Sequence, residues 1–347
     1  MTERPSQPVE ATNAIPLEAR RHPLVHEIER GFRWACGGEA PGPVVLAVSG
    51  GRDSMALLIA SAVLREHDTF AILPRVVHVH HHLRPEADDE AEHVLAVAAV
   101  LDVPAEVRHL KSPAHTPGDA RRLRYEALQQ AAMACRSNLV ATGHHAEDQL
   151  ETILAALGRG AGPSGLAGMP RRRTLEDDVS LVRPMLSVSR MDAEALCRAA
   201  GTRWCDDPGN VDINTQRGRL RRDVLPVLEA MWPGVASRAA AGADLQSVAA
   251  TALEGLVTSV FGTSDRQTWS RLELSGLPIA VIASGLRRAV LACGPLGSDG
   301  VSHSALFAAA EAVGDRRDHR RRYELGGGIE IIVEAIEIRI EQTQGDA

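Results

Sequence analysis

The chain has 347 residues, of which 44% are hydrophobic and 3% aromatic, and it carries a formal net charge of −7 at pH 7. This length exceeds one typical domain, so we expect two or three. Because the net charge is negative, the protein as a whole does not attract nucleic acid electrostatically. Any RNA contact must therefore come from local basic patches. The sequence shows no signal peptide and no apolar run approaching the roughly 18 residues that span a bilayer, so we expect a soluble cytoplasmic protein without membrane contact.

Cysteine and lysine usage narrows the function classes further. The five cysteines are scattered, and none forms a Cys-x-x-Cys pair, so the sequence indicates neither a disulfide framework nor a zinc ribbon. Lys111 is the only lysine, and arginine supplies nearly all the positive charge. The arginine runs at 171–173, 217–222 and 316–322 are candidate RNA contacts, and a GC-rich genome is the alternative explanation.

Three regions follow one another along the chain. Residues 1–20 are polar and contain three prolines, which predicts a disordered lead. Strands and helices alternate from about residue 43 to 205, which predicts an α/β domain over residues 21–225 with a doubly wound parallel sheet. Residues 226–347 are first Ala-rich and helical, and then Ile and Glu alternate after a glycine turn, which predicts a smaller helical or α+β domain ending in a hairpin.

The segment Ser49-Gly50-Gly51-Arg52-Asp53-Ser54 lies between an apolar run at 44–48 and an apolar helix at 55–60. A buried strand, a glycine turn and a helix start together form a cradle for an anion, because free N–H groups and the helix dipole favour negative charge. No Gly-Lys-Ser/Thr follows the glycines, so this is not a Walker A motif. An ordinary turn is the alternative.

Two other segments carry charged groups at helical spacing. Arg121 and Arg124 share one helical face, where two guanidinium groups suit a phosphate, or else form a solvated face. In the segment 141–152, a strand ends at His144 and His145, and Asp148 and Glu151 then share a face of the next helix. Paired carboxylates near a nucleotide hold Mg²⁺ or an ammonium group. Acidic residues in a first helical turn also simply complement the helix dipole.

These motifs, in this order, carry a family resemblance. The hexapeptide resembles the PP-loop of the ATP pyrophosphatases, which split ATP into AMP and pyrophosphate. The whole set, over about residues 43–226, resembles the tRNA(Ile)-lysidine synthetase family. It comprises Ser-Gly-Gly-x-Asp-Ser, Ala-Arg-x-x-Arg-Tyr, Thr-Gly-His-His-x-x-Asp-Gln-x-Glu-Thr, Arg159-Gly160-x-Gly162-x-x-Gly165-Leu166, Arg183-Pro184-Met185-Leu186, Trp204-Cys205-Asp206-Asp207-Pro208 and Arg217-x-x-x-Arg221.

The resemblance implies a PP-loop ATPase fold, like the adenine nucleotide alpha hydrolases, and a two-step reaction. ATP adenylates the wobble cytidine of an isoleucine tRNA with a CAU anticodon, and free L-lysine then displaces AMP. The implied ligands are ATP with Mg²⁺, this tRNA and lysine, and a homodimer is left open.

The resemblance also assigns roles to this chain's residues. ATP binding is assigned to Ser49, Gly50, Gly51, Arg52, Asp53 and Ser54, and Asp53 is also assigned to Mg²⁺. Contacts with the adenylate are assigned to Asp53, Arg121, Arg124 and His144. Lysine binding is assigned to Asp148 and Glu151, and tRNA binding to Arg217 and Arg221. Beyond the resemblance, the arginine run before the hairpin predicts tRNA phosphate contacts at Arg320, Arg321 and Arg322.

Two departures from the family pattern leave alternatives open. His80 stands where the family has Asp, within His78-Val79-His80-His81-His82, and Gly218 stands where it favours Asn. The histidine run raises the alternative of a metal site, although alternating strand side chains do not converge. The rival functions are tRNA thiolation by a related PP-loop enzyme and a non-catalytic relative that binds tRNA or nucleotide.

Overall fold

The computed structural model of the chain describes residues 15–67, 69–80, 87–110, 116–176, 178–205, 215–262, 266–293, 300–315 and 320–342. These residues form two compact units. The first contains the described residues up to 154 together with 168–242, and the second contains 155–167 and the described residues from 243 onward.

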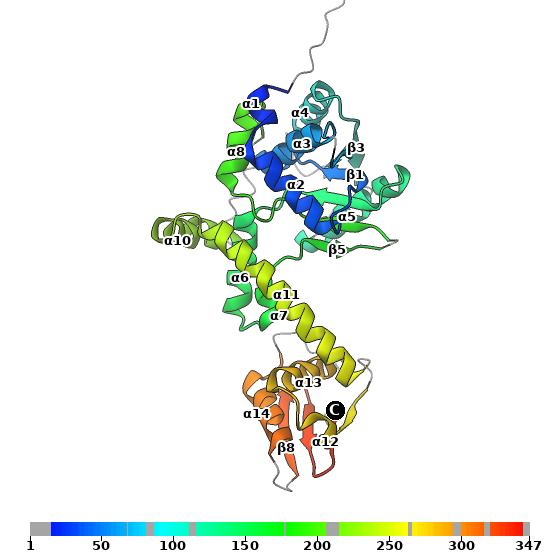
Figure 1. The fold of residues 1–347 in the computed structure, drawn as a ribbon, viewed down its shortest axis with the longest axis vertical. Helices are drawn as coiled ribbons and strands as arrows, with labels where there is room; N and C mark the ends of the chain where they lie inside the picture. Colours follow the sequence, from blue (N-terminus) through cyan, green and yellow to red (C-terminus); the bar gives the residue numbers. More distant parts are fainter. Residues whose placement is uncertain are drawn as a thin grey trace, which may run out of the picture. The chain divides into compact units, whose positions relative to one another are not determined.

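A six-stranded sheet with the strand order β3-β2-β1-β4-β6-β5 forms the centre of the first unit (Figure 1). The strands are β1 (Gly42–Ala47), β2 (Ile72–His80), β3 (Ala105–His109), β4 (Leu139–Thr142), β5 (Arg172–Thr174) and β6 (Ser180–Val182). All neighbours pair in parallel except β5, which lies antiparallel to β6 at one edge. The predicted α/β class with a parallel sheet is confirmed.

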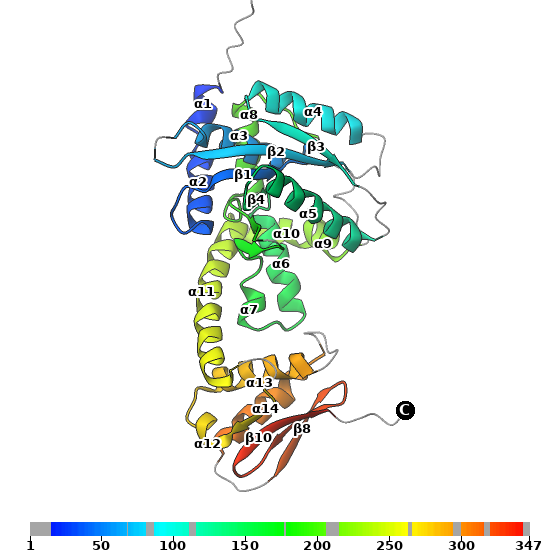
Figure 2. The same cartoon turned by 90° about the vertical axis from the view of Figure 1, so that its right-hand side faces the viewer.

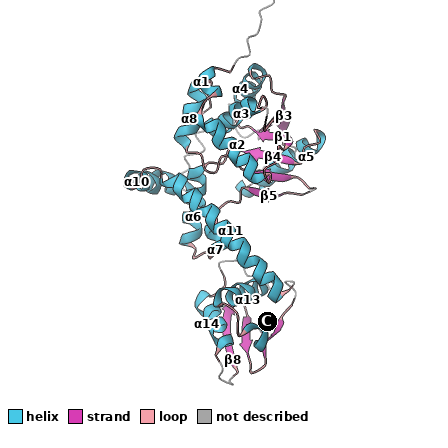
Figure 3. Cartoon of the chain, viewed as in Figure 1, coloured by secondary structure: helices cyan, strands magenta, loops and turns pink. Residues whose placement is uncertain are grey.

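Helices cover both faces of this sheet, as Figures 2 and 3 show. Val44 and Leu46 of β1 belong to one hydrophobic core, and Val45 belongs to the other. Because successive strand residues point to opposite faces, a strand covered on both faces must be continuously apolar. The first core is completed by α2 (Pro23–Ala35), α3 (Arg52–Leu64), α4 (Ala87–Val100) and α8 (Arg190–Ala199), and the second by α5 (Pro117–Ala134).

The end of the predicted disordered lead is folded. Residues 1–14 lie outside the described residues, but Leu17–Arg20 forms the short helix α1. Ile15 and Ala19 are buried in the first core, and Arg20 pairs with Glu66. The two apolar side chains within a polar segment account for this difference, since burying them ties the segment to the unit.

A four-stranded antiparallel sheet with the order β7-β10-β9-β8 forms the second unit together with its helices. The predicted hairpin is confirmed: Gly327 and Gly328, both with positive φ, connect β8 to β9. The Ile/Glu stretch then turns once more and adds β10. The elements are β7 (Thr268–Ser270), α12 (Arg271–Leu274), α13 (Ile279–Cys293), α14 (His303–Gly314), β8 (Arg321–Gly326), β9 (Ile329–Val333) and β10 (Glu337–Gln342).

The Ala-rich helix α11 (Val235–Phe261) begins within the first unit, whereas the sequence placed a domain boundary at residue 225. Its residues Ala236 and Ala240 pack against Ala146 and Leu150 of α6 (Ala146–Gly158), so the composition change precedes the change of core. Within the described residues, no helix has both the length and the apolar character needed to cross a membrane. The remaining elements are α7 (Pro163–Leu166), α9 (Gln216–Arg219), a π-helical turn (Leu220–Val224) and α10 (Leu225–Met231).

At Gly31 of α2, the backbone of Pro184 packs directly against the helix. A Cβ at this position would lie 1.9 Å from the carbonyl oxygen of Pro184. We expect Gly31→Ala to lower the free energy of unfolding by about 1–3 kcal/mol through overpacking. Gly242→Ala is the matched control, since no atom lies within 4 Å of its Cβ position in α11, and it should be neutral or stabilise by up to about 1 kcal/mol. Urea unfolding measures both, and equal effects would contradict the steric explanation.

Candidate functional site

The phosphate loop, Ser49–Gly51, connects β1 to α3 and leaves the start of that helix open. Gly50 has φ +89°, a conformation that glycine adopts without strain. Gly51 is the N-cap of α3 and offers no side-chain acceptor, whereas Thr116 and Ser189 cap α5 and α8. The first N–H groups of α3 are therefore arranged to receive an anion.

Hydrogen bonds fix the shape of this loop from within and from outside. The hydroxyl of Ser54 donates to the Gly51 carbonyl at 2.8 Å and accepts the N–H of Ser49 at 3.2 Å. The N–H of Cys205 donates to the Gly50 carbonyl at 2.9 Å. The side chain of Arg52 turns toward Glu194 of α8 and toward Asp53, at 3.5 and 3.2 Å. Only the backbone of Arg52 therefore belongs to the cradle.

The end of β4 lies directly beside this loop, because Ala47 of β1 is paired in register with Thr142 of β4. Gly143 packs against the peptide bond that joins Asp53 and Ser54. A Cβ at Gly143 would lie 3.0–3.1 Å from the atoms of that peptide. The absence of a side chain at residue 143 therefore allows the segment after β4 to lie against the first turn of α3.

His145 joins the two halves of the site. Its Nδ1 lies 2.9 Å from Glu147 Oε2, and its Nε2 lies 3.5 Å from both Asp53 Oδ2 and Asp148 Oδ2. Burial alone lowers the pKa of His145, but the three carboxylates outweigh it and raise the pKa to about 9. The ring is thus an imidazolium at neutral pH, and it holds Asp53 and Asp148 near one another.

Asp148 and Glu151 lie together on α6, as predicted, and they share a cation. Arg221 donates from Nη2 to Asp148 Oδ1 at 2.8 Å and from Nε to Glu151 Oε1 at 2.5 Å. Asp148 also accepts a hydrogen bond from the backbone N–H of His145 at 3.1 Å. It therefore also satisfies a backbone donor at the start of α6, which was the alternative explanation for an acidic residue at this position. The sequence placed Arg221 with the tRNA contacts, whereas the structure brings it onto the predicted lysine carboxylates.

Arg121, Arg124 and Arg173 surround the ring of Tyr125, with guanidinium carbons 5.0, 5.2 and 5.3 Å from its centroid. Burial alone raises the pKa of Tyr125, but Arg124 and Arg121 outweigh it and lower the pKa. In the part of the chain that the structure describes, none of these three arginines pairs with a carboxylate. The cluster is therefore a concentration of positive charge suited to phosphate.

His144 lies between this cluster and the carboxylates. Burial lowers the pKa of His144 well below its usual value, and Arg183 adds to that effect while Asp148 opposes it. Its Nδ1 shares a 2.8 Å hydrogen bond with the hydroxyl of Thr142. The ring is therefore neutral, in contrast to that of His145.

The C-terminal arginines are paired with acidic side chains of their own unit. Arg320 lies 3.2 Å from Glu334, Arg321 lies 2.7 Å from Asp315, and Arg322 lies 3.5 Å from Glu330. Arg316 and Arg317 of the same run lie outside the described residues. The described part of this run is a charge-balanced face and not a set of free cations.

The two departures from the family pattern have local explanations. Nε2 of His80 lies 3.1 Å from Asp88 of α4, and Gly218 is buried in α9 with its N–H donated to the Thr215 hydroxyl. His81 and His82 lie outside the described residues. Among the residues that are described, no three His, Cys, Asp or Glu side chains gather as metal ligands.

Sequence reasoning assigned no role to His145, Tyr125 or Arg183. All three lie inside motifs that the sequence displays, Ala-Arg-x-x-Arg-Tyr, Thr-Gly-His-His and Arg-Pro-Met-Leu, so membership in a motif was the available signal. Arg173 was predicted only as part of an arginine run that could contact RNA. Its contact with Tyr125 had no sequence signal, because it arises from the edge strand β5.

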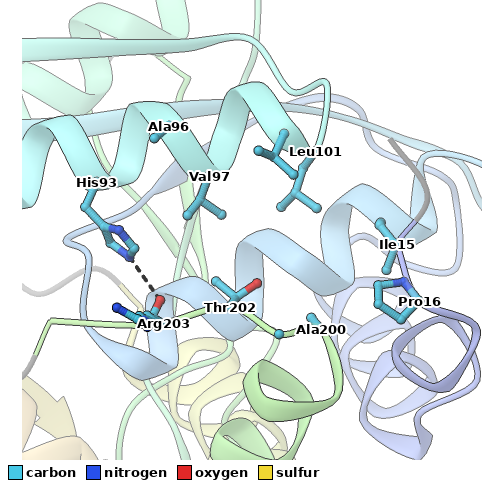
Figure 4. A pocket seen from close by; sticks show the side chains of 11 residues that line it. Ile15, Pro16, His93, Ala96, Val97, Leu101, Ala200, Thr202 and Arg203 are labelled. Carbon is cyan, nitrogen blue, oxygen red and sulfur yellow. Dashed lines mark hydrogen bonds between the residues drawn. The ribbon is translucent and has the colours of Figure 1, made fainter. Parts of the chain in front are cut away.

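A hollow of about 460 Å³ lies elsewhere in the first unit, between α4 and the end of α8 (Figure 4). Its lining is mostly aliphatic, and none of the predicted site residues contributes to it. A triphosphate needs N–H donors and cations, so this hollow is not suited to the nucleotide.

The contact of Gly143 with the first turn of α3, directly after the phosphate loop, gives a direct test. We expect Gly143→Ala to raise the dissociation constant for ATP by about tenfold or more, because even small displacements of a positioned loop are costly. The unfolding midpoint should change little by comparison. Gly158→Ala is the control, since no atom lies within 4 Å of its Cβ position. Unchanged ATP affinity in Gly143→Ala would show that the loop tolerates the shift.

Comparisons with known proteins agree with this geometry. The chain is 38% identical over 238 residues to a tRNA(Ile)-lysidine synthase of Pseudomonas fluorescens, covering 67% of this chain and 52% of the relative. It is 39% identical over 230 residues to a tRNA(Ile)-lysidine synthase of Salinispora arenicola, covering 62% and 66%. The chain thus spans between about half and two thirds of the length of these relatives. The predicted resemblance is confirmed at this level.

A solved structure shares the fold at low sequence identity. The U34-tRNA thiolase NcsA from Methanococcus maripaludis, solved with its [4Fe-4S] cluster, superposes with a TM-score of 0.52 at 15% identity, covering 65% of this chain and 80% of that one. A family model described as a PP-loop domain matches residues 25–228. With its open glycine loop between β1 and α3, the chain belongs to the PP-loop family.

Proposed function

We propose that this protein joins free L-lysine to C2 of the wobble cytidine of an isoleucine tRNA with a CAU anticodon, at the expense of ATP. The observation that carries the proposal is the juxtaposition of the phosphate loop with the Asp148–Glu151 pair, across the adjacent ends of β1 and β4. A triphosphate and an amine are the two ligands that such a pair of half-sites suits. The similarity to lysidine synthases supports this reading.

In the first step, the C2 oxygen of the cytidine attacks the α-phosphorus of ATP, an O–P bond forms, and pyrophosphate leaves. The loop N–H groups and the start of α3 would hold the triphosphate. Asp53 is one carboxylate beside that loop, which fits Mg²⁺, since this ion is usually held by one or two carboxylates together with phosphates. When bound, Mg²⁺ neutralises charge on the leaving pyrophosphate.

In the second step, the ε-amine of lysine attacks C2, the C2–O bond breaks, and AMP leaves with that oxygen. Arg121 and Arg124 would stabilise the negative charge of the adenylate. His144 is neutral, so it can hydrogen-bond to the adenylate without competing with the arginines. Asp148 and Glu151 would hold lysine, and we place the reaction in the cytoplasm, where all three substrates occur.

The reaction test measures the products of ATP. We expect AMP and pyrophosphate to form in the presence of isoleucine tRNA with a CAU anticodon, and radiolabelled lysine to become fixed on that tRNA. The matching control is a methionine tRNA, which carries the same anticodon in another tRNA body. Formation of ADP and phosphate would exclude the proposal, and lysine-independent sulfur incorporation would favour thiolation instead.

Docking of the tRNA is proposed for Arg217, which is exposed on α9, and for Arg320, Arg321 and Arg322. The C-terminal three must exchange a carboxylate partner for a phosphate, so we expect replacing all three with Ala to weaken tRNA binding by less than about tenfold. The slope of log affinity against log salt concentration should become less steep by the equivalent of up to about three phosphate contacts. Arg288→Ala is the control, because Arg288 of α13 is paired with Glu254 of α11 and shares no carboxylate with the run. An unaltered salt slope in the triple variant would exclude the run from the tRNA interface.

A further inference from the structure

Four arginines from three elements of the first unit lie close together. Burial lowers the pKa of Arg121, Tyr125 opposes that shift, and three neighbouring arginines add to it. Like charges repel one another, so they stay together only where the fold holds them and a ligand compensates them. The cluster therefore indicates a ligand that carries several negative charges. The three neighbours are Arg124 of α5, Arg173 of β5 and Arg217 of α9.

The ring of Tyr125 holds three of these arginines in place without neutralising them. The guanidinium carbons of Arg121, Arg124 and Arg173 lie 5.0, 5.2 and 5.3 Å from its centroid, within the range of cation–π attraction. Nε of Arg124 is buried and has no hydrogen-bond partner among the described residues. The protein thus positions these charges and leaves donors for an anion to satisfy.

The carboxylates of the site are paired with other cations. Arg221 binds both Asp148 and Glu151, and Asp148 also faces the imidazolium of His145. The phosphate that joins AMP to the cytidine carries one negative charge, whereas four guanidinium groups carry four positive charges. One adenylate phosphate leaves most of this charge uncompensated, so the cluster is suited to more than one phosphate.

Arg173 is the member of the cluster that comes from the edge of the sheet. β5 is the outermost strand, and its residues are exposed. The preceding Arg172 points to the opposite face, where it donates to the carbonyl of Ala35 at 3.4 Å. Of these two neighbours, Arg173 alone faces Tyr125, and in the described chain it has no carboxylate partner. A phosphate can therefore reach Arg173 from the open edge of the sheet without displacing an ion pair.

We propose that this cluster holds two phosphates at once, the phosphate of the adenylate and a backbone phosphodiester of the RNA strand next to the reacting cytidine. Arg121 and Arg124 keep the adenylate, and Arg173 binds the backbone phosphodiester through its guanidinium fork. This inference rests on the proposed function and deepens it, because it adds a contact with the tRNA strand at the reacting nucleotide itself. Holding the strand there restricts the motion of the C2 oxygen, which must reach the α-phosphorus of ATP.

The test pairs a change in the protein with a change in one phosphate of the RNA. Isoleucine tRNA with a CAU anticodon is prepared with a single neutral methylphosphonate directly 5′ or directly 3′ of the wobble cytidine, and its Kd is measured without ATP or lysine. For unmodified tRNA, we expect Arg173→Ala to raise the Kd by about tenfold, the effect of losing one charged hydrogen bond at an exposed site. One of the two methylphosphonates should raise the Kd of the native protein equally. In Arg173→Ala the same methylphosphonate should change the Kd by less than about twofold, because both changes remove one shared contact.

Arg173→Glu produces a change of sign that damage to the fold cannot imitate. Its carboxylate repels the phosphodiester, so this variant should bind the methylphosphonate tRNA about threefold or more tightly than it binds unmodified tRNA. Arg122→Ala is the matched control, since Arg122 lies beside Arg121 in α5 but is paired with Glu126. It should leave the Kd of every tRNA within about twofold.

These binding measurements and the lysidine reaction can fail separately. If lysidine forms while the effects of Arg173→Ala and of both methylphosphonates simply multiply, the inference is overturned and the proposed function stands. Coupled effects without lysidine formation support the phosphate contact and remove the proposed function. A Kd for unmodified tRNA that Arg173→Ala leaves unchanged, or a native protein that binds none of these tRNAs, overturns the inference. A rise confined to the KM of ATP would assign Arg173 to the triphosphate instead.

Discussion

The imidazolium of His145 is the interaction on which the rest of the site depends. Glu147, Asp148 and Asp53 all face this one ring, and they belong to two elements that follow different strands. Without the positive charge, three half-buried carboxylates would lie close together and repel one another. The phosphate loop and the Asp148–Glu151 pair are therefore not independent, because any group that perturbs Asp148 also changes the electric field at Asp53.

Opposite charges are kept on two sides of the end of β4. Carboxylates collect around His145 and Arg221, and arginines collect around Tyr125. The neutral His144 lies between them, where a charged ring would be repelled by Arg183, Arg124 and Arg121. This separation allows one site to hold both a phosphate, which needs cations, and an ammonium, which needs anions, without the two sets of residues neutralising each other.

The parts of the structure that could be predicted from the sequence are those governed by local pattern. The apolar run at 44–48, the glycine turn and the helix that follows form β1, the phosphate loop and α3, and Asp148 and Glu151 share a face of α6 because helical spacing requires it. Pairings between distant segments could not be predicted. The partners of Arg221 and the contact of His145 with Asp53 depend on strand order, which no local pattern encodes. The Ala-rich helix α11 begins in the first unit because its first residues pack on α6, and the sequence composition gave no sign of this contact.

The placement of the arginines also bears on how an acidic chain would handle RNA. In the second unit, Arg320 and Arg322 face Glu334 and Glu330 from a neighbouring segment of the sheet, so the run is matched by the Ile/Glu alternation beside it. In the first unit, the described arginines around Tyr125 have no carboxylate partners. A phosphate that approaches the first group must displace an ion pair, whereas one that approaches the second only displaces water and counterions. The stronger phosphate contacts are therefore expected beside the chemistry, where they would also hold the reacting nucleotide in position.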